Sequence, residues 1–177
     1  MSSEALIVVD VQRSFDLDPA WGPRNNPACD ENVALLLEDF RRRGEAVVFV
    51  RHDSLETGSL TPGHPGNEFK DVITGEPDVL VTKHVNSAFI GEPDLDGWLR
   101  ERGIKKIAVC GIQTNMCCET TARMGGNLGY DVDFVIDATH TFDHNGFDAD
   151  TLSRVTAANL DGEFATVVST ADHLQRK

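Results

Sequence analysis

ALIVVD, at residues 5–10, is a continuous apolar run that ends on a carboxylate. It contains the first of six short runs rich in valine and isoleucine, most of which are apolar at consecutive rather than alternate positions. Continuous runs of this kind are typical of strands that are buried on both faces of a parallel sheet. The expected strands are 6–10, 46–51, 79–83, 106–112, 132–137 and 165–169.

Segments with helical periodicity and helix-capping residues separate these runs. Asp30, Asp94 and Thr114 are placed to cap three helices, because their side-chain oxygens can accept hydrogen bonds from the first turn. In a fourth helix, Leu152 and Val155 are expected to face the core. The expected helices are 30–43, 94–103, 114–129 and roughly 149–160.

The alternation of strands and helices predicts an α/β fold. We expect a single-domain, doubly wound, six-stranded and mainly parallel sheet with helices on both faces. A chain of 177 residues is long enough for one full core and short for two, so residues 1–177 are expected to form one domain.

The chain is acidic, with 29 Asp and Glu against 16 Lys and Arg and a formal net charge of −13. Nucleic acids and anionic membranes need a basic surface, so neither is an expected partner. No apolar run approaches the roughly 18–20 residues of a membrane span, and the N-terminal residues predict no signal peptide. Four cysteines without a zinc-type C-x-x-C pair predict free thiols, and we expect a cytoplasmic protein.

Three reactive side chains lie at, or just past, the C-terminal ends of apolar runs: Asp10, Lys83 and Cys117. The carboxyl ends of parallel strands meet at one edge of a sheet, where open α/β folds bind ligands. The aspartate could take the thiol proton, and the lysine could hold both anions. The alternative is that Asp10 is a turn residue and that Lys83 extends to water.

Cys117 is the candidate nucleophile. With Thr114 as the cap it falls in the first helical turn, where free N–H groups and the helix dipole favour a thiolate and can form an oxyanion hole. The alternative is a small buried hydrophobic residue. Cys118 is expected to pack against the sheet and Cys110 to lie in the core, while Cys29 precedes a helix without an expected role.

A metal site is an alternative for the histidines, although no metal is expected, because their spacing matches no compact ligand motif. The candidate ligands are His52, Asp53, His64 and His84. His52 and His64 are instead expected to line the pocket or to lie on a loop surface. His140 and His144 follow the fifth apolar run and are expected near the same sheet edge, with no assigned role.

Three sequence blocks resemble the signature of the isochorismatase-like cysteine hydrolases, of the isochorismatase and nicotinamidase superfamily. The blocks are IVVDVQRSF (7–15), TKHVNSAF (82–89) and GIQTNMCCETTARMGGNLGYDVDFVIDA (111–138). The corresponding family patterns are D-x-Q-x-x-F, K-x-x-x-S/N-A-F, and G-x-x-T-x-x-C-V-x-x-T-A-R followed by G-Y-x-V. The resemblance covers about residues 5–170, and the third block is the specific one.

The resemblance implies six parallel strands flanked by helices and a role for each reactive residue. Asp10 would be the general base, Lys83 would stabilise the charged pair, and Cys117 would form an acyl-enzyme that water hydrolyses. The backbone N–H groups of Gln113 and Cys117 would form the oxyanion hole, and the Ile112–Gln113 peptide bond is expected to be cis. The family also implies a homo-oligomer, either a dimer or a tetramer, and no cofactor is expected.

The chain departs from the family pattern in three respects. Cys118 replaces the usual valine after the nucleophile. Arg51-His52-Asp53 replaces the metal-binding D-x-H of the nicotinamidase branch, which argues against nicotinamide as the substrate. True isochorismatases cleave a vinyl ether without a cysteine nucleophile, so a thiol favours a small molecule with an amide or ureido-type C–N bond.

Specificity in such a fold is expected in loops 13–28, 52–77 and 139–147. The stretch 52–77 is rich in Gly, Pro, Ser and Thr and follows a strand, which predicts a lid or a pocket wall. The residues expected to line the pocket and bind the substrate are Phe15, Trp21, His52 and Phe89.

Two other classes of function stay open. A thiol redox-responsive protein could use Cys117 with Cys118 or Cys110, but this hypothesis leaves Asp10 and Lys83 without a role. A non-catalytic module could bind a small molecule between the same loops. Nucleotide binding has little support, because no Gly-rich phosphate loop follows the first strand.

Overall fold

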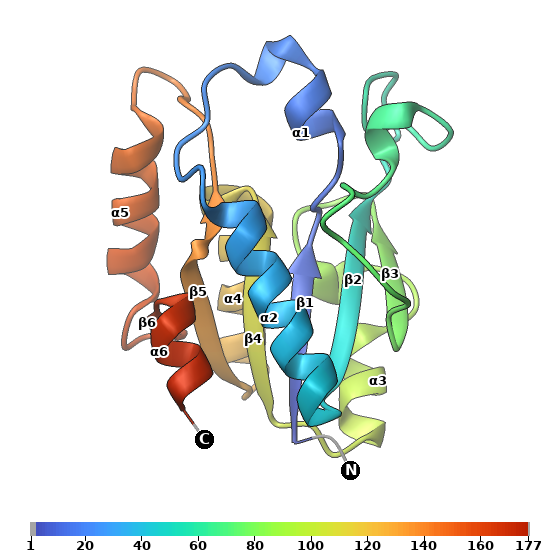
Figure 1. The fold of residues 1–177 in the computed structure, drawn as a ribbon, viewed down its shortest axis with the longest axis vertical. Coiled ribbons are helices and arrows are strands. Elements are labelled where there is room, and N and C mark those ends of the chain that lie inside the picture. The colour runs from blue at the N-terminus through green and yellow to red at the C-terminus, as the bar shows by residue number, and fades with distance from the viewer. Residues whose placement is uncertain (1–2, 177) are drawn as a thin grey trace.

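Six strands form one parallel sheet in the computed structural model, which describes residues 3–176 (Figure 1). Their order is β3-β2-β1-β4-β5-β6, and every neighbouring pair is parallel. This sheet confirms the predicted α/β architecture. The strands are β1 Glu4–Val9, β2 Ala46–His52, β3 Val79–Lys83, β4 Lys106–Ile112, β5 Asp131–His140 and β6 Thr166–Val168.

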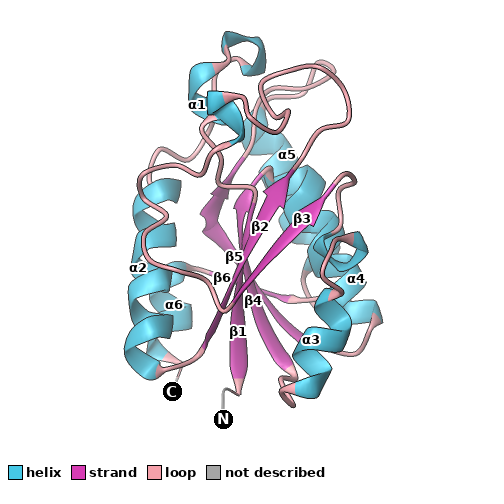
Figure 2. Cartoon of the chain, turned by 90° about the vertical axis from the view of Figure 1, so that its right-hand side faces the viewer, coloured by secondary structure: helices cyan, strands magenta, loops and turns pink. Residues whose placement is uncertain are grey.

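Helices cover both faces of the sheet: α2 and α6 lie on one face, and α3, α4 and α5 lie on the other (Figure 2). No helix within residues 3–176 is long and apolar enough to cross a membrane. The helices are α1 Ser14–Leu17, α2 Cys29–Arg43, α3 Leu95–Glu101, α4 Glu119–Asn127, α5 Ala149–Leu160 and α6 Thr170–Gln175. A π-helix, Thr114–Cys118, precedes α4, and short 3₁₀ helices span Pro19–Trp21, Pro65–Asn67 and Ala88–Ile90.

The continuous apolar run of β1 explains why the sheet is buried on both faces. Alternate side chains of a strand point to opposite faces. Ile7 and Val9 therefore pack in the core under α3, α4 and α5, whereas Leu6 and Val8 pack in the core under α2 and α6. Since β1 is paired on one side with β2 and on the other with β4, a polar residue in its middle would be buried without solvent.

Two of the predicted helix caps are wrong. α2 begins at Cys29, so Asp30 lies inside its first turn, where the Oδ2 atom of Asp30 is 3.2 Å from Lys70 Nζ. Thr114 lies inside the π-helix rather than capping it, and its hydroxyl donates to Thr139 Oγ1 at 2.8 Å. Asp94 does cap α3 as predicted, because it accepts a hydrogen bond from the N–H group of Asp96.

The helix predicted over residues 149–160 is confirmed as α5, but its buried face differs from the prediction. Val155 is 51% exposed, and Leu152 is half-buried. Thr156 and Leu160 are the residues that α5 buries in its second half. The periodicity of a short helix leaves its rotation about its own axis open, and here contacts with β5 and β6 decide it.

The strand order produces a topological switch point between β1 and β4. From β1 the sheet grows through β2 to β3, and from β4 it grows through β5 to β6. The chain therefore leaves the two central strands in opposite directions, and a crevice opens between their carboxyl ends. Asp10 follows β1 and Gln113 follows β4, so both residues border this crevice.

Gly111 allows β4 to pair closely with β1 next to this crevice. Its φ is +123°, and a Cβ atom added there would lie 2.0 Å from the backbone oxygen of Val9. Pairing of β4 with β5 also shifts register between Val109 and Gly111. A side chain at Gly111 would therefore push apart β1 and β4, whose carboxyl ends border the crevice.

We expect Gly111→Ala to lower the free energy of unfolding by about 3 kcal/mol or more, because both the clash and the φ value oppose a side chain. Gly103→Ala is the matched control: Gly103 also has a positive φ, +68°, but nothing lies within 4 Å of an added Cβ. Its expected loss is about 1 kcal/mol. Urea unfolding followed by circular dichroism measures both values, and equal losses would contradict the steric argument.

Candidate active site

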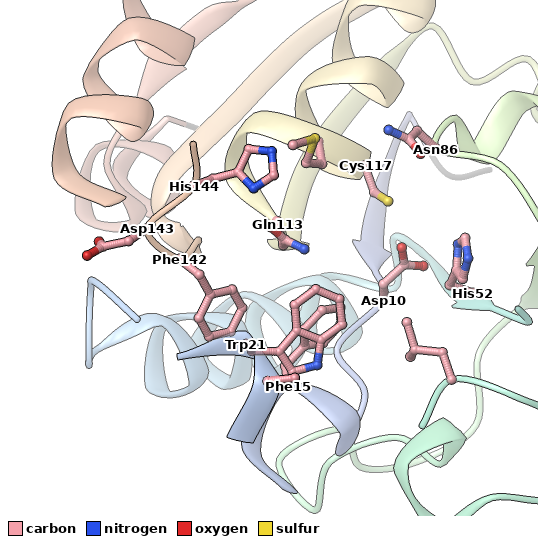
Figure 3. Close-up of a pocket in the computed structure, with 13 residues that line it drawn as sticks. Asp10, Phe15, Trp21, His52, Asn86, Gln113, Cys117, Phe142, Asp143 and His144 are labelled. Carbon is pink, nitrogen blue, oxygen red and sulfur yellow. The ribbon is translucent and has the colours of Figure 1, made fainter. Parts of the chain in front are cut away.

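The structure brings together the three residues predicted from the strand ends. Lys83 Nζ is 2.6 Å from Asp10 Oδ2 and 3.4 Å from Cys117 Sγ. Asp10 and Lys83 are each 1% exposed, whereas Cys117 is half-buried and borders a cavity. Figure 3 shows Asp10 and Cys117 directed toward one another from opposite sides of the crevice. The predicted triad is therefore a contiguous cluster.

Asp10 is held in an uncommon backbone conformation. Its φ is +51°, in the left-handed region that costs a non-glycine residue about 1 kcal/mol or more. The N–H group of Asp10 donates to Val50 O at 2.9 Å, and its C=O group accepts from the N–H group of Gln12 at 2.7 Å. These bonds aim the carboxylate at Lys83 through Oδ2, while Oδ1 is buried without a hydrogen-bond partner. Oδ1 is thus free to accept a proton.

The Lys83 ammonium is stable in the protein interior because of its partners. Burial by itself lowers the pKa of a lysine, but the interaction with the Asp10 carboxylate opposes this effect, and the pKa of Lys83 is raised. The lysine therefore stays charged and neutralises the Asp10 carboxylate.

Cys117 is a protonated thiol at neutral pH. Burial, and then the Asp10 carboxylate, raise the pKa of Cys117 to about 12, although Lys83 opposes the shift. Only the helix terminus, which favours a thiolate, was considered from the sequence, whereas burial and the neighbouring anion favour the neutral thiol. The thiol must lose its proton as it reacts, and Asp10 is the adjacent acceptor.

A cavity of about 420 Å³ opens over this cluster. Phe15 from α1, Trp21 and Phe142 form an aromatic wall, as Figure 3 shows. Ring centroids are 4.8 Å apart for Phe15 and Trp21 and 5.7 Å apart for Trp21 and Phe142. His52 also borders the cavity, so the structure places three of the four predicted pocket residues there.

Phe89 does not line the cavity, contrary to the prediction. It is 8% exposed and packs in the core under α3 and α4, with its ring stacked on Tyr130 at 5.7 Å. Phe89 lies in the 3₁₀ helix Ala88–Ile90, which Ser87 caps, and its ring packs toward Gly125 of α4 rather than toward the crevice.

Several lining residues were not singled out from the sequence. Loop 139–147 was predicted to contribute to specificity, and His144 was expected near this edge without a role, but nothing in the pattern distinguished Phe142 from its neighbours. The lining residues missed by the sequence analysis are Ala20, Leu60, Asn86, Met116, Phe142, Asp143 and His144. They come from five separate segments, so only the folded chain brings them to one cavity.

The loop between β2 and β3 forms one wall of the cavity through Leu60. Asn67 fixes this loop, because its buried Nδ2 donates to the carbonyl oxygens of His52 at 3.0 Å and of Leu60 at 2.9 Å. Gln12 Nε2 in turn donates to Asn67 O at 2.8 Å. These bonds support the prediction that residues 52–77 make a pocket wall.

Gln113 lies at the junction of β4 and the π-helix and borders the cavity. The Ile112–Gln113 peptide bond is cis, as the resemblance implies. The carbonyl oxygen of Gln113 accepts hydrogen bonds from the N–H groups of Met116 and Cys118, both at 3.2 Å. The first turn of the π-helix is thus closed on Gln113, and Cys117 follows within it.

The residues considered as metal ligands in the sequence do not gather. Arg51 Nε donates to Asp53 Oδ1 at 2.9 Å, so Asp53 is held in an ion pair. His64 Nδ1 accepts from the Gly66 N–H group, and His84 Nδ1 lies 2.5 Å from the carbonyl oxygen of Asp53. Each is engaged locally, away from a common centre.

A different set, Asp10, His52 and Cys117, places three ligand atoms within 4.8 Å of one another. The Lys83 ammonium, however, is within 3.4 Å of all three residues. A cation therefore already occupies the position between these donors, and a metal ion would have to displace it. The donor set therefore does not fit a metal ion.

The remaining cysteines and His140 are enclosed in the core. Cys29, Cys110 and Cys118 are fully buried free thiols, and burial raises the pKa of each one. Their positions give the redox hypothesis no accessible second thiol. His140 is buried as well, both ring nitrogens lack a hydrogen-bond partner, and burial lowers its pKa to about 2.

Comparison with known proteins shows the family to which the chain belongs. Residues 4–172 match the isochorismatase domain family. The uncharacterised isochorismatase family protein YrdC of Bacillus subtilis (strain 168) is 40% identical over 176 residues, which cover 94% of this chain and 92% of that protein. Nicotinamidase 3 of Arabidopsis thaliana is 32% identical, and the matched region covers 97% of this chain and 87% of that protein.

The fold also matches a solved structure, that of a proposed hydrolase of the isochorismatase family from Chromobacterium violaceum ATCC 12472. The TM-score is 0.91 at 38% identity, and the match covers 97% of this chain and 92% of the other. The family match extends over nearly all of the described residues. This chain therefore belongs to the isochorismatase family of hydrolases.

Proposed function

We propose that the protein is a cysteine hydrolase that cleaves an amide or ureido-type C–N bond of a small molecule. The observation that carries this proposal is the Lys83 ammonium, which lies between the Asp10 carboxylate and the Cys117 thiol at the base of a cavity. A thiol, an adjacent base and a group that orients the base are the requirements of nucleophilic catalysis. The relative named nicotinamidase supports amide chemistry within the family.

The first half of the reaction transfers the acyl group to sulfur. Asp10 Oδ1, which has no other partner, takes the thiol proton as Cys117 Sγ attacks the substrate carbonyl carbon. The carbonyl oxygen becomes an oxyanion, for which the backbone N–H groups of Gln113 and Cys117 are the proposed donors. When the C–N bond breaks, Asp10 returns the proton to the leaving nitrogen, which departs as an amine or ammonia.

The second half of the reaction uses the same groups in reverse. Asp10, again a carboxylate, accepts a proton from a water molecule that attacks the thioester carbon. The C–S bond breaks, the acid is released, and the proton passes back to Cys117. Lys83 stays charged throughout and stabilises whichever partner carries the negative charge, which limits the cost of separating charge in a buried site.

The lining of the cavity favours an uncharged or cationic substrate. No Lys or Arg of residues 3–176 lines the cavity, and the Lys83 ammonium below it is already engaged by Asp10. One wall is aromatic, and Asp143 contributes a carboxylate at the exposed rim. An anionic substrate would lose its hydration without gaining a cationic partner, which is costly. This argues against a dicarboxylate such as isochorismate.

We expect Cys117→Ala to lose at least about a thousandfold in kcat, because no other group can form the acyl-enzyme. The assay follows ammonia release from a panel of small amides and ureido compounds, together with intact mass. Wild-type protein should carry an acyl adduct on Cys117 at steady state, and Cys117→Ala should carry none. Cys118→Ala is the matched control, since this neighbour points into the core, and it should keep both the adduct and turnover. Release that survives in Cys117→Ala would refute the assignment.

We expect a charge preference among matched substrates. Benzamide and 4-(aminomethyl)benzamide should be accepted, and 4-carboxybenzamide should have a kcat/KM at least about tenfold lower, because its carboxylate finds no partner. Where turnover is too slow to rank them, protection of Cys117 from iodoacetamide gives the same ranking. Equal kcat/KM values for 4-carboxybenzamide and benzamide would contradict the charge preference. Asp143→Lys should reduce the difference in kcat/KM between these two compounds.

A further inference from the structure

His52 is directly connected to the reactive lysine. It ends β2, is paired in register with Lys83 on β3, and places Nδ1 at 3.1 Å from Lys83 Nζ. The Gln12 side-chain amide holds the His52 backbone through two hydrogen bonds: the His52 N–H group donates to Gln12 Oε1 at 2.9 Å, and the His52 carbonyl oxygen accepts from Gln12 Nε2 at 3.0 Å. The position of this ring is therefore set by the sheet and by a buried glutamine.

The hydrogen bonds around Lys83 determine the state of the His52 ring. A lysine ammonium has three N–H donors and no acceptor. Its three neighbours are Asp10 Oδ2 at 2.6 Å, His52 Nδ1 at 3.1 Å and Cys117 Sγ at 3.4 Å. Nδ1 can bind the ammonium only as an acceptor, so the ring is neutral and carries its proton on Nε2. Burial, and then Lys83, lower the pKa of His52, which agrees with a neutral ring.

With these three acceptors, only one orientation of the Lys83 ammonium gives each of its N–H groups a hydrogen-bond partner. Without Nδ1, one N–H group of Lys83 would be buried without a partner, which costs roughly 1–3 kcal/mol. The ammonium could reduce that cost only by turning away from Cys117 or by drawing in water. The imidazole thereby keeps the third donor directed at the sulfur, although it does not touch the sulfur itself.

We propose that His52 is a positioning residue of this site, which holds the Lys83 ammonium against Cys117 through its Nδ1 lone pair. The proposal rests on the proposed hydrolase function for its catalytic consequence, because it assigns a role in that reaction. Its physical content is independent of turnover, since it concerns how strongly Lys83 stabilises the sulfur anion. Alkylation of Cys117 reports that stabilisation without any substrate.

The test compares His52→Asn with His52→Leu. These two side chains have nearly the same shape, but asparagine places a carbonyl oxygen where Nδ1 lies and leucine places a methyl group there. The rate of iodoacetamide alkylation at Cys117 is measured from pH 6 to 10 by mass spectrometry. His84→Leu is the control for loss of a nearby histidine, since its ring binds the Asp53 carbonyl group instead of Lys83.

We expect His52→Leu to move the alkylation profile to higher pH by about 0.5–1 unit, which slows alkylation about three- to tenfold at a fixed pH. His52→Asn and His84→Leu should stay within about twofold of wild type, because both keep an acceptor for Lys83. For a hydrolysed substrate, kcat should follow the same order. Equal profiles for His52→Asn and His52→Leu, or a shift of His52→Leu to lower pH, would overturn the proposal. If no substrate were turned over, only the proposed hydrolase function would be contradicted, because alkylation of Cys117 tests the role of His52 without a substrate.

Discussion

The buried ion pair between Lys83 and Asp10 is the interaction on which the rest of the site depends. Moving a single ammonium or carboxylate out of water costs several kcal/mol, so neither residue could be buried here alone. At 2.6 Å, with both side chains almost fully enclosed, each compensates the other. The remaining features of the site follow from this requirement: the ammonium needs further acceptors, and His52 and Cys117 provide them.

The sheet order explains why these groups can meet. Asp10, His52 and Lys83 lie at the carboxyl ends of three adjacent strands, β1, β2 and β3, which places them in a row on one edge. Cys117 approaches from the other half of the sheet, after β4, across the switch point. The crevice between the halves lets the thiol face this row, while the loops above it close the cavity with aromatic side chains.

The site keeps several groups in states that a stable core would avoid. Asp10 has a left-handed backbone and an unpartnered Oδ1, and Cys117 carries a proton that burial and a neighbouring anion hold in place. Each of these features is a cost in the resting protein. The unpartnered Oδ1 and the protonated thiol both change when the thiol proton moves to Oδ1 and a new bond forms at sulfur, whereas the Asp10 backbone keeps the carboxylate in place. Unfavourable backbone and protonation states of this kind are typical of functional sites, and here they lie around the Cys117 sulfur atom.

The sequence by itself determined the strands and the residues at their ends. Continuous Val and Ile runs have one stable location, a sheet buried on both faces, and so the positions of Asp10, Lys83 and Cys117 could be predicted from the pattern. The signature blocks added the cis peptide bond at Gln113. These features are local, because each depends on neighbours along the chain.

Only the tertiary structure decided the properties that depend on contacts through space. Phe89 and Phe142 are both aromatic residues after strands, yet Phe89 packs against Gly125 in the core, whereas Phe142 packs against Phe15 and Trp21 and borders the cavity. Val155 is exposed although its spacing suits a buried face. The raised pKa of Cys117 depends on burial and on Asp10, which is 107 positions away in the chain. Desolvation and electrostatic interactions depend on distances in space, and these distances cannot be read from the separation of two residues along the chain.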